Sequence, residues 1–192
     1  MNVSGPVLVR RWPEGPALPP RGQPVLVRVA TAQARPAARG ELREVLRQVL
    51  AEWSGLPAGQ LPLEETPRGP VWRGRLCGET LDISLSYATG EGWIGLIRGG
   101  WIGVDVTSVT PLAEAEAVAR HYLGPSAAAG IRAAVSPARA LASAWTERES
   151  RLKCLKQGLV EWSAAQAETE AACHCYELVL NDHLVGAVSW RQ

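Results

Sequence analysis

The sequence predicts an α+β fold with mostly antiparallel sheet. The expected strands follow one another as hairpins rather than as strand–helix–strand crossovers, and two long segments have the apolar spacing of helices. The chain has 192 residues, of which 46% are hydrophobic and 20% charged, so it can bury a core without disulfides or metal. A weak likeness between two halves, each with strands and a helix, is visible, without a sequence repeat.

The first hundred residues are predicted to form strands around one long helix. Apolar residues spaced i, i+3, i+4 and i+7 predict the helix over residues 35–53, and four prolines predict a loop over residues 55–70. Apolar runs, alternation of apolar and polar residues and flanking glycines mark the strands. The strands are expected at residues 6–12, 25–29, 81–86 and 93–98.

The second half is predicted to contain two helices and a closing hairpin. Gly99 and Gly100 predict a tight turn that pairs the strand at 93–98 with a strand at 101–106. Helical spacing predicts the two helices, and apolar runs on either side of a polar turn predict the hairpin. The helices are expected over residues 112–123 and 137–155, and the hairpin strands over residues 175–180 and 184–190.

The charge of the chain is nearly balanced, with 20 Lys and Arg against 19 Asp and Glu. This balance argues against a dedicated nucleic-acid binder, which carries a basic excess. Only Lys153 and Lys156 are lysines; the other basic residues are arginines, which we attribute mainly to a coding bias. Three of the arginines, at positions 39, 43 and 47, form a stripe on the first helix, which we interpret as a solvated face because glutamates lie nearby.

The expected location is the cytoplasm, with no membrane association. The chain has no run of eighteen apolar residues, and residues 1–6 lack the charged and apolar regions of a signal peptide. The four cysteines are not spaced as in a secreted disulfide framework, so we expect reduced thiols.

Two segments carry residues that could perform chemistry. Asp105 lies in an otherwise apolar strand, and a buried carboxylate needs a partner or a metal, although a strand-end Asp can also face water. Glu149 and Lys153 are spaced i, i+4 on the second long helix, which alone suits an exposed ion pair worth about 0.3–0.5 kcal/mol. Together, two carboxylates suit Mg²⁺ with phosphate oxygens, and Lys153 suits a phosphate.

These segments resemble the 4′-phosphopantetheinyl transferases of the longer, Sfp-like type, which include holo-acyl-carrier-protein synthases. The family pattern is Gly-x-Asp, then about forty residues, then Trp-x-x-Lys-Glu-x-x-x-Lys; here residues 103–105 read GVD and residues 145–153 read WTERESRLK. Upstream, residues 68–70 resemble the family's Gly-Lys-Pro element and residues 83–87 its Asn-Leu-Ser-His segment. Arg39 matches a family arginine that binds the CoA 3′-phosphate. The resemblance covers about residues 35–160.

The resemblance implies a fold and an activity. The family fold is a pseudo-dimer of two similar α/β halves with a coenzyme A site between them, here residues 1–100 and 101–192, so a monomer is expected. Such enzymes transfer the 4′-phosphopantetheine arm of coenzyme A to a serine of an apo acyl or peptidyl carrier protein, releasing adenosine 3′,5′-bisphosphate.

The resemblance also implies roles for individual residues. Asp105 and Glu149, with Thr107, would hold Mg²⁺; Glu149 would help take the proton from the serine, and Lys153 would offset phosphate charge. The residues implied in coenzyme A binding are Arg39, Arg68, Ser86, Tyr87, Arg148 and Lys153.

The sequence departs from the family at three of these positions. Thr107 stands where a third acid is common, Tyr87 where a histidine is usual, and Arg148 where the motif has lysine. Thr107 predicts weaker metal binding, and Tyr87 keeps a hydrogen bond but no charge. Two alternatives therefore stay open: a weak or degenerate relative that binds coenzyme A or a carrier protein, and a Mg²⁺-dependent phosphoesterase.

Overall fold

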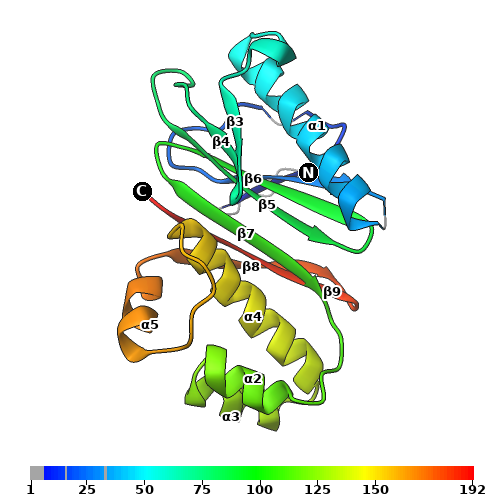
Figure 1. Cartoon of the computed structure of the whole chain (residues 1–192), viewed down its shortest axis with the longest axis vertical. Coiled ribbons are helices and arrows are strands. Elements are labelled where there is room, and N and C mark those ends of the chain that lie inside the picture. Colours follow the sequence, from blue (N-terminus) through cyan, green and yellow to red (C-terminus); the bar gives the residue numbers. More distant parts are fainter. Residues whose placement is uncertain (1–6, 16, 33) are drawn as a thin grey trace.

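Two β-sheets pack face to face, and each carries helices on its outer face (Figure 1). The computed structural model describes residues 7–15, 17–32 and 34–192. Residues 1–6, which include Pro6, the expected start of the first strand, and which lack the features of a signal peptide, lie outside the described residues. The α+β class and the mostly antiparallel pairing are confirmed.

The first sheet has the strand order β1-β2-β6-β5 and is built from the first half of the chain. Its strands β1 and β2 are parallel, and the other pairs are antiparallel. The helix α1 (Arg35–Ser54) covers one face, because Leu42, Leu46 and Leu50 are fully buried against the sheet. The strands are β1 (Leu8–Arg11), β2 (Val25–Ala30), β5 (Leu81–Ala88) and β6 (Glu91–Arg98).

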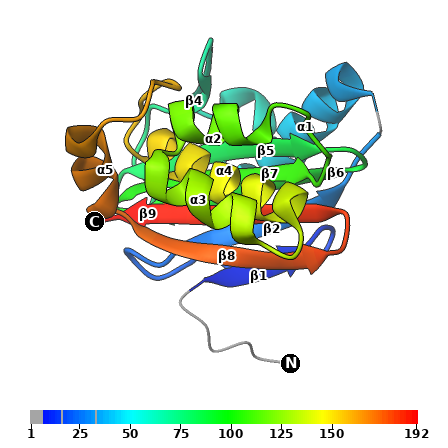
Figure 2. The same cartoon turned by 90° about the horizontal axis from the view of Figure 1, so that it is seen from below.

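The second sheet has the strand order β7-β9-β8 and is built from the second half of the chain. Its strands are β7 (Trp101–Ser108), β8 (His174–Asn181) and β9 (Leu184–Arg191), all antiparallel. The helix α4 (Pro137–Cys154) lies across β7 and β9. The helices α2 (Ala115–Tyr122) and α3 (Pro125–Ala133) lie in front of α4 in Figure 2, on the side of α4 that faces away from this sheet.

Three of the four strands of the first sheet repeat the order of the strands in the second sheet. Each contains a strand, a helix and a hairpin in chain order: β2, α1, β5 and β6 in one, and β7, α4, β8 and β9 in the other. In both, the first strand pairs with the last, and the middle strand lies at the sheet edge. A buried cluster that includes Leu26, Trp93, Val104 and Val188 fills the space between the sheets.

The predicted pairing of residues 93–98 with residues 101–106 is wrong. The strand β6 lies between β2 and β5, so both of its hydrogen-bonding edges are occupied. The strand β7 pairs with β9 instead. Gly99 and Gly100 therefore carry the chain from one sheet to the other, and Gly99 takes the left-handed conformation with φ of 68°.

The predicted loop at residues 55–70 is also wrong in part. It contains a short 3₁₀ helix (Ala58–Gln60) and most of a hairpin formed by β3 (Leu63–Thr66) and β4 (Gly69–Trp72). Proline is tolerated here because the hairpin is two-stranded, so both of its strands are edges. Two further helices, α3 and α5 (Ala164–Ala171), were not predicted, and α2 is shorter than expected.

The four cysteines are free thiols. No helix among the described residues is long and apolar enough to cross a membrane.

A row of polar side chains on β5 joins the facing edges of the two sheets. Asp82, Ser84 and Ser86 of β5 accept hydrogen bonds from the backbone N–H groups of alternate β7 residues at 2.7, 2.9 and 3.0 Å. The β7 donors are Ile102, Val104 and Val106. Because unpaired buried N–H groups are costly, the alternating polar residues of β5 fix how the halves meet.

Candidate functional site

A cavity of about 840 Å³ lies between the two halves, and we call it the inter-sheet cavity. It is lined by α1, the β3–β4 turn, β5, β7, α4 and the segment that follows α4. Eight of the nine predicted site residues line it although they come from distant parts of the chain. They are Arg39, Arg68, Ser86, Tyr87, Asp105, Thr107, Glu149 and Lys153.

Asp105 is a buried, partnered carboxylate rather than a strand-end residue facing water. It is 9% exposed, and its Oδ1 lies 2.7 Å from the Lys153 ammonium. The Ser86 hydroxyl donates to the same oxygen at 3.1 Å. The Lys153 ammonium also donates to the Val104 carbonyl at 3.0 Å. These contacts hold Asp105 in one orientation at the wall of the cavity.

Glu149 lies beside this pair without a partner of its own. Among the described residues, no hydrogen bond or ion pair to its carboxylate is found; Lys153 binds Asp105, so the exposed Glu149–Lys153 pair is not what forms. Burial raises the pKa of Glu149, the Asp105 carboxylate raises it further, and Lys153 and Arg148 lower it. Two carboxylates thus lie near one ammonium, which pairs with Asp105, and a second cation would relieve their repulsion.

The donor set fits Mg²⁺. Asp105 and Glu149 supply hard oxygen ligands, and the Thr107 hydroxyl lies two residues beyond Asp105 at the cavity wall. The described residues contain no group of three or more His, Cys, Asp and Glu placed to hold a metal, so the remaining ligands would be waters or substrate oxygens. Mg²⁺ keeps several waters in such sites.

Gly103 explains why α4 can bring its side chains to Asp105. A Cβ at this position would overlap the Ser150 carbonyl oxygen and lie 2.5 Å from the Cys154 backbone nitrogen. Glycine therefore allows the α4 backbone to lie directly on β7. The Ser150 and Ser189 hydroxyls, 2.8 Å apart, join α4 to β9.

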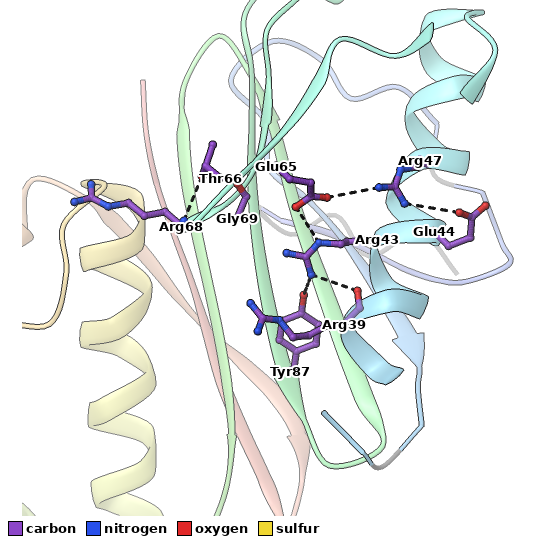
Figure 3. A network of polar contacts seen from close by, with 9 residues as sticks. All are labelled: Arg39, Arg43, Glu44, Arg47, Glu65, Thr66, Arg68, Gly69 and Tyr87. Atoms are coloured by element: carbon purple, nitrogen blue, oxygen red, sulfur yellow. Dashed lines mark hydrogen bonds and ion pairs between the residues drawn. The ribbon is translucent and has the colours of Figure 1, made fainter. Parts of the chain in front are cut away.

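The opposite wall of the cavity is basic. Figure 3 shows Arg43 of α1 between Glu65 and Tyr87. Its guanidinium donates to the Glu65 carboxylate at 2.9 Å and to the Tyr87 hydroxyl at 3.3 Å. Because the phenol oxygen accepts from Arg43, its hydrogen is left to donate elsewhere. The expectation that the arginine stripe is a solvated face is therefore wrong in part. Arg39 and Arg43 line the cavity, whereas Arg47 pairs with Glu44 and Glu65.

Arg68 reaches across from the β3–β4 turn toward the end of α4 (Figure 3). Its backbone N–H donates to the Thr66 hydroxyl at 3.2 Å, and its guanidinium donates to the Lys156 carbonyl at 2.9 Å. Arg68 therefore links the first half of the chain to the second at the cavity rim.

Arg148 is the predicted site residue that does not line the cavity. Its side chain is 6% exposed, and its guanidinium lies 3.3 Å from Glu170 of α5, itself 8% exposed. It also donates to the Glu161 carbonyl at 3.5 Å. Its position suits holding α5 against α4 rather than contacting a ligand in the cavity.

Two charged residues that line the cavity were not predicted as site residues. Arg43 was visible only as a member of the arginine stripe, and Lys156 only as one of the two lysines. No protein-family model matches the chain, and no curated protein matches its sequence.

Proposed function

We propose that this protein transfers the 4′-phosphopantetheine arm of coenzyme A to a serine of an apo acyl or peptidyl carrier protein. The other product is adenosine 3′,5′-bisphosphate. The observation that carries the proposal is the convergence of eight motif residues on one cavity. These residues belong to motifs that resemble those of the 4′-phosphopantetheinyl transferases, and they are spread from residue 39 to residue 153 of the chain.

The repeated topology supports the two-half architecture of that family. We propose that residues 1–100 and 101–192 form a pseudo-dimer within one chain. In support, strands β2, β6 and β5 of the first sheet are ordered like β7, β9 and β8 of the second, and residues of both halves line the cavity. A single chain would then carry a complete site, so we expect a monomer.

The chemistry of the cavity walls suits an anionic substrate with several phosphates. Arg39 and Arg68 are exposed at the cavity and suit the 3′-phosphate and diphosphate of coenzyme A. The Tyr87 hydroxyl, held by Arg43, can donate to a phosphate oxygen. A volume of about 840 Å³ is within the range of small-molecule sites.

The proposed reaction is an attack of the carrier serine hydroxyl on the phosphorus that bears the pantetheine arm. A new P–O bond to serine forms, and the P–O bond to the bridging oxygen breaks. Glu149 takes the serine proton, directly or through a water. Lys153 stabilises negative charge on the phosphate oxygens.

Asp105 keeps the Lys153 ammonium beside Glu149, so the base and the cation share one wall. Mg²⁺, held by Asp105, Glu149 and Thr107, would supply charge neutralisation at the diphosphate.

Intact-mass spectrometry tests the proposal. The protein is incubated with coenzyme A, Mg²⁺ and a panel of apo carrier proteins, and a carrier that gains the phosphopantetheine mass supports transfer. Glu149→Gln is expected to lower the rate about 100-fold or more. Glu147→Gln is the matched control on the same helix, because Glu147 is exposed and pairs with Arg151.

The alternatives predict different outcomes. Binding of coenzyme A with no mass gain on any carrier would favour the degenerate relative suggested by Thr107 and Tyr87. Hydrolysis of simple phosphoesters that Glu149→Gln abolishes would favour the phosphoesterase. Absence of both coenzyme A binding and transfer would contradict the proposal.

A further inference from the structure

Lys156 occupies a backbone position that normally requires glycine. It follows Leu155, the C-cap residue of α4, with φ of 59°, in the left-handed region. Gln157 donates to the Leu152 carbonyl at 2.9 Å and Lys156 to the Lys153 carbonyl at 3.1 Å, which is the hydrogen-bond pattern of a Schellman motif. Glycine is favoured at this position because a Cβ strains the left-handed backbone.

The contacts of the Lys156 side chain explain why this left-handed position holds a lysine rather than a glycine. It lines the inter-sheet cavity, and its ammonium donates to Asp82 at 2.6 Å and to the Ile102 carbonyl at 3.4 Å. The side chain is 41% exposed, so its ammonium keeps access to a ligand. A helix terminus alone would be served as well or better by glycine.

Lys156 is also the neighbour of two other cations. Lys153 donates to the Val104 carbonyl, two residues along β7 from Ile102, so the carbonyls that the two ammonium groups contact lie on the order of 7 Å apart. The Arg68 guanidinium donates to the Lys156 carbonyl at 2.9 Å. Three positive groups from two halves of the chain therefore meet at one end of the cavity, a concentration that suits a polyanion.

We propose that Lys156 is an anion-binding residue of the inter-sheet cavity, where its ammonium contacts a phosphate group of the substrate beside Lys153 and Arg68. The identity of that substrate as coenzyme A rests on the proposed function. The strained backbone keeps the Lys156 ammonium at the cavity and its carbonyl available to Arg68.

The substitution Lys156→Gly tests this inference, because glycine keeps the left-handed backbone and removes only the side chain. Calorimetric titrations measure the Kd for coenzyme A and, separately, for inorganic pyrophosphate. We expect both Kd values to rise about tenfold or more, since a hydrogen bond to a charged phosphate is lost. The melting temperature is expected to stay within about 3 °C, because relief of strain offsets the lost ion pair with Asp82.

Cys77→Gly is the matched control. Cys77 is the other non-glycine residue with positive φ in the described part of the chain, at 51°, and it is exposed and does not line the cavity. It is expected to leave both Kd values unchanged. Lys156→Arg keeps the charge and is expected to retain most of the affinity.

The outcomes separate this inference from the proposed function. Unchanged Kd values in a folded Lys156→Gly variant would overturn the inference and leave the function standing. Pyrophosphate binding that weakens in the variant, with no coenzyme A binding by the unmodified protein, would sustain the inference and overturn the function. Failure of the unmodified protein to bind either probe would overturn both. If Lys156→Gly does not fold, Lys156→Asn serves instead, because asparagine tolerates the left-handed region.

Discussion

Gly103→Ala is expected to damage both the fold and the site, because it places a methyl group between β7 and α4. The methyl carbon would overlap the Ser150 carbonyl oxygen and lie 2.5 Å from the Cys154 nitrogen. Both are helix backbone atoms, which cannot rotate away as a side chain could. Ordinary contacts need about 3.5 Å, so α4 must move by about 1 Å or more from β7.

The displacement sets the size of the effect. Overpacking of this kind costs about 1–3 kcal/mol, and the backbone clash places Gly103→Ala at the upper end. For a chain of this length, the melting temperature is expected to fall by about 6–12 °C. A shift of about 1 Å between Lys153 and Asp105 is expected to lower transfer about 100-fold.

Thermal unfolding and the carrier mass assay measure the two effects. The matched control is Gly130→Ala in α3, where an added Cβ meets nothing within 4 Å. It is expected to stabilise the protein by about 0.5–1 kcal/mol and to leave transfer unchanged. A Gly103→Ala variant that melts within about 2 °C of the unmodified protein and keeps its transfer rate would refute the close approach of α4 to β7.

Three further substitutions have expected outcomes. Glu149→Gln without divalent metal is expected to raise the melting temperature by about 1–3 °C near pH 7, because the pKa of Glu149 is raised in the fold and its ionisation costs stability as pH rises through that pKa. The gain should vanish as pH falls to about 4, and a gain that grows instead would contradict the assignment. Arg148→Met is expected to cost about 3–5 kcal/mol in denaturant unfolding, because Glu170 is left buried and unpaired, and adding Glu170→Leu should restore most of it; no loss would show that the pair is not buried in solution. Ser84→Ala is expected to lower the free energy of unfolding by about 1–3 kcal/mol, because the Val104 N–H loses its acceptor. A variant as stable as the original would argue against the hydrogen bonds between β5 side chains and the β7 backbone.

The long elements of the fold could be predicted because their patterns are long. The helices α1 and α4 carry apolar residues over several turns, and β5 alternates through six residues, so local periodicity was sufficient. Short helices were missed because α3 and α5 are rich in alanine and small, which leaves little periodic signal.

Strand partners could not be predicted from local signals. Gly99 and Gly100 indicate a turn, but the sequence does not show that β2 and β5 already occupy both edges of β6. The partner that β7 takes, β9, begins 76 residues after β7 ends. Such pairing depends on distant segments, so a tight turn was interpreted as a hairpin.

The candidate site was predicted where motif spacing matched a known pattern, as for Asp105, Glu149 and Lys153. Arg148 shows the limit of this reasoning. It is adjacent to Glu149, but consecutive helix residues point about 100° apart, and its partner Glu170 lies 22 residues further along the chain. Lys156 was missed because its importance comes from a backbone angle and a cavity that only the folded chain shows.

A calorimetric titration of coenzyme A in the presence of Mg²⁺ tests whether both halves of the chain build one binding site. We predict one molecule bound per chain, with Kd raised about tenfold both by Arg39→Ala in the first half and by Lys153→Met in the second. Absence of binding, or binding that neither substitution weakens, would contradict the claim that the inter-sheet cavity is the coenzyme A site.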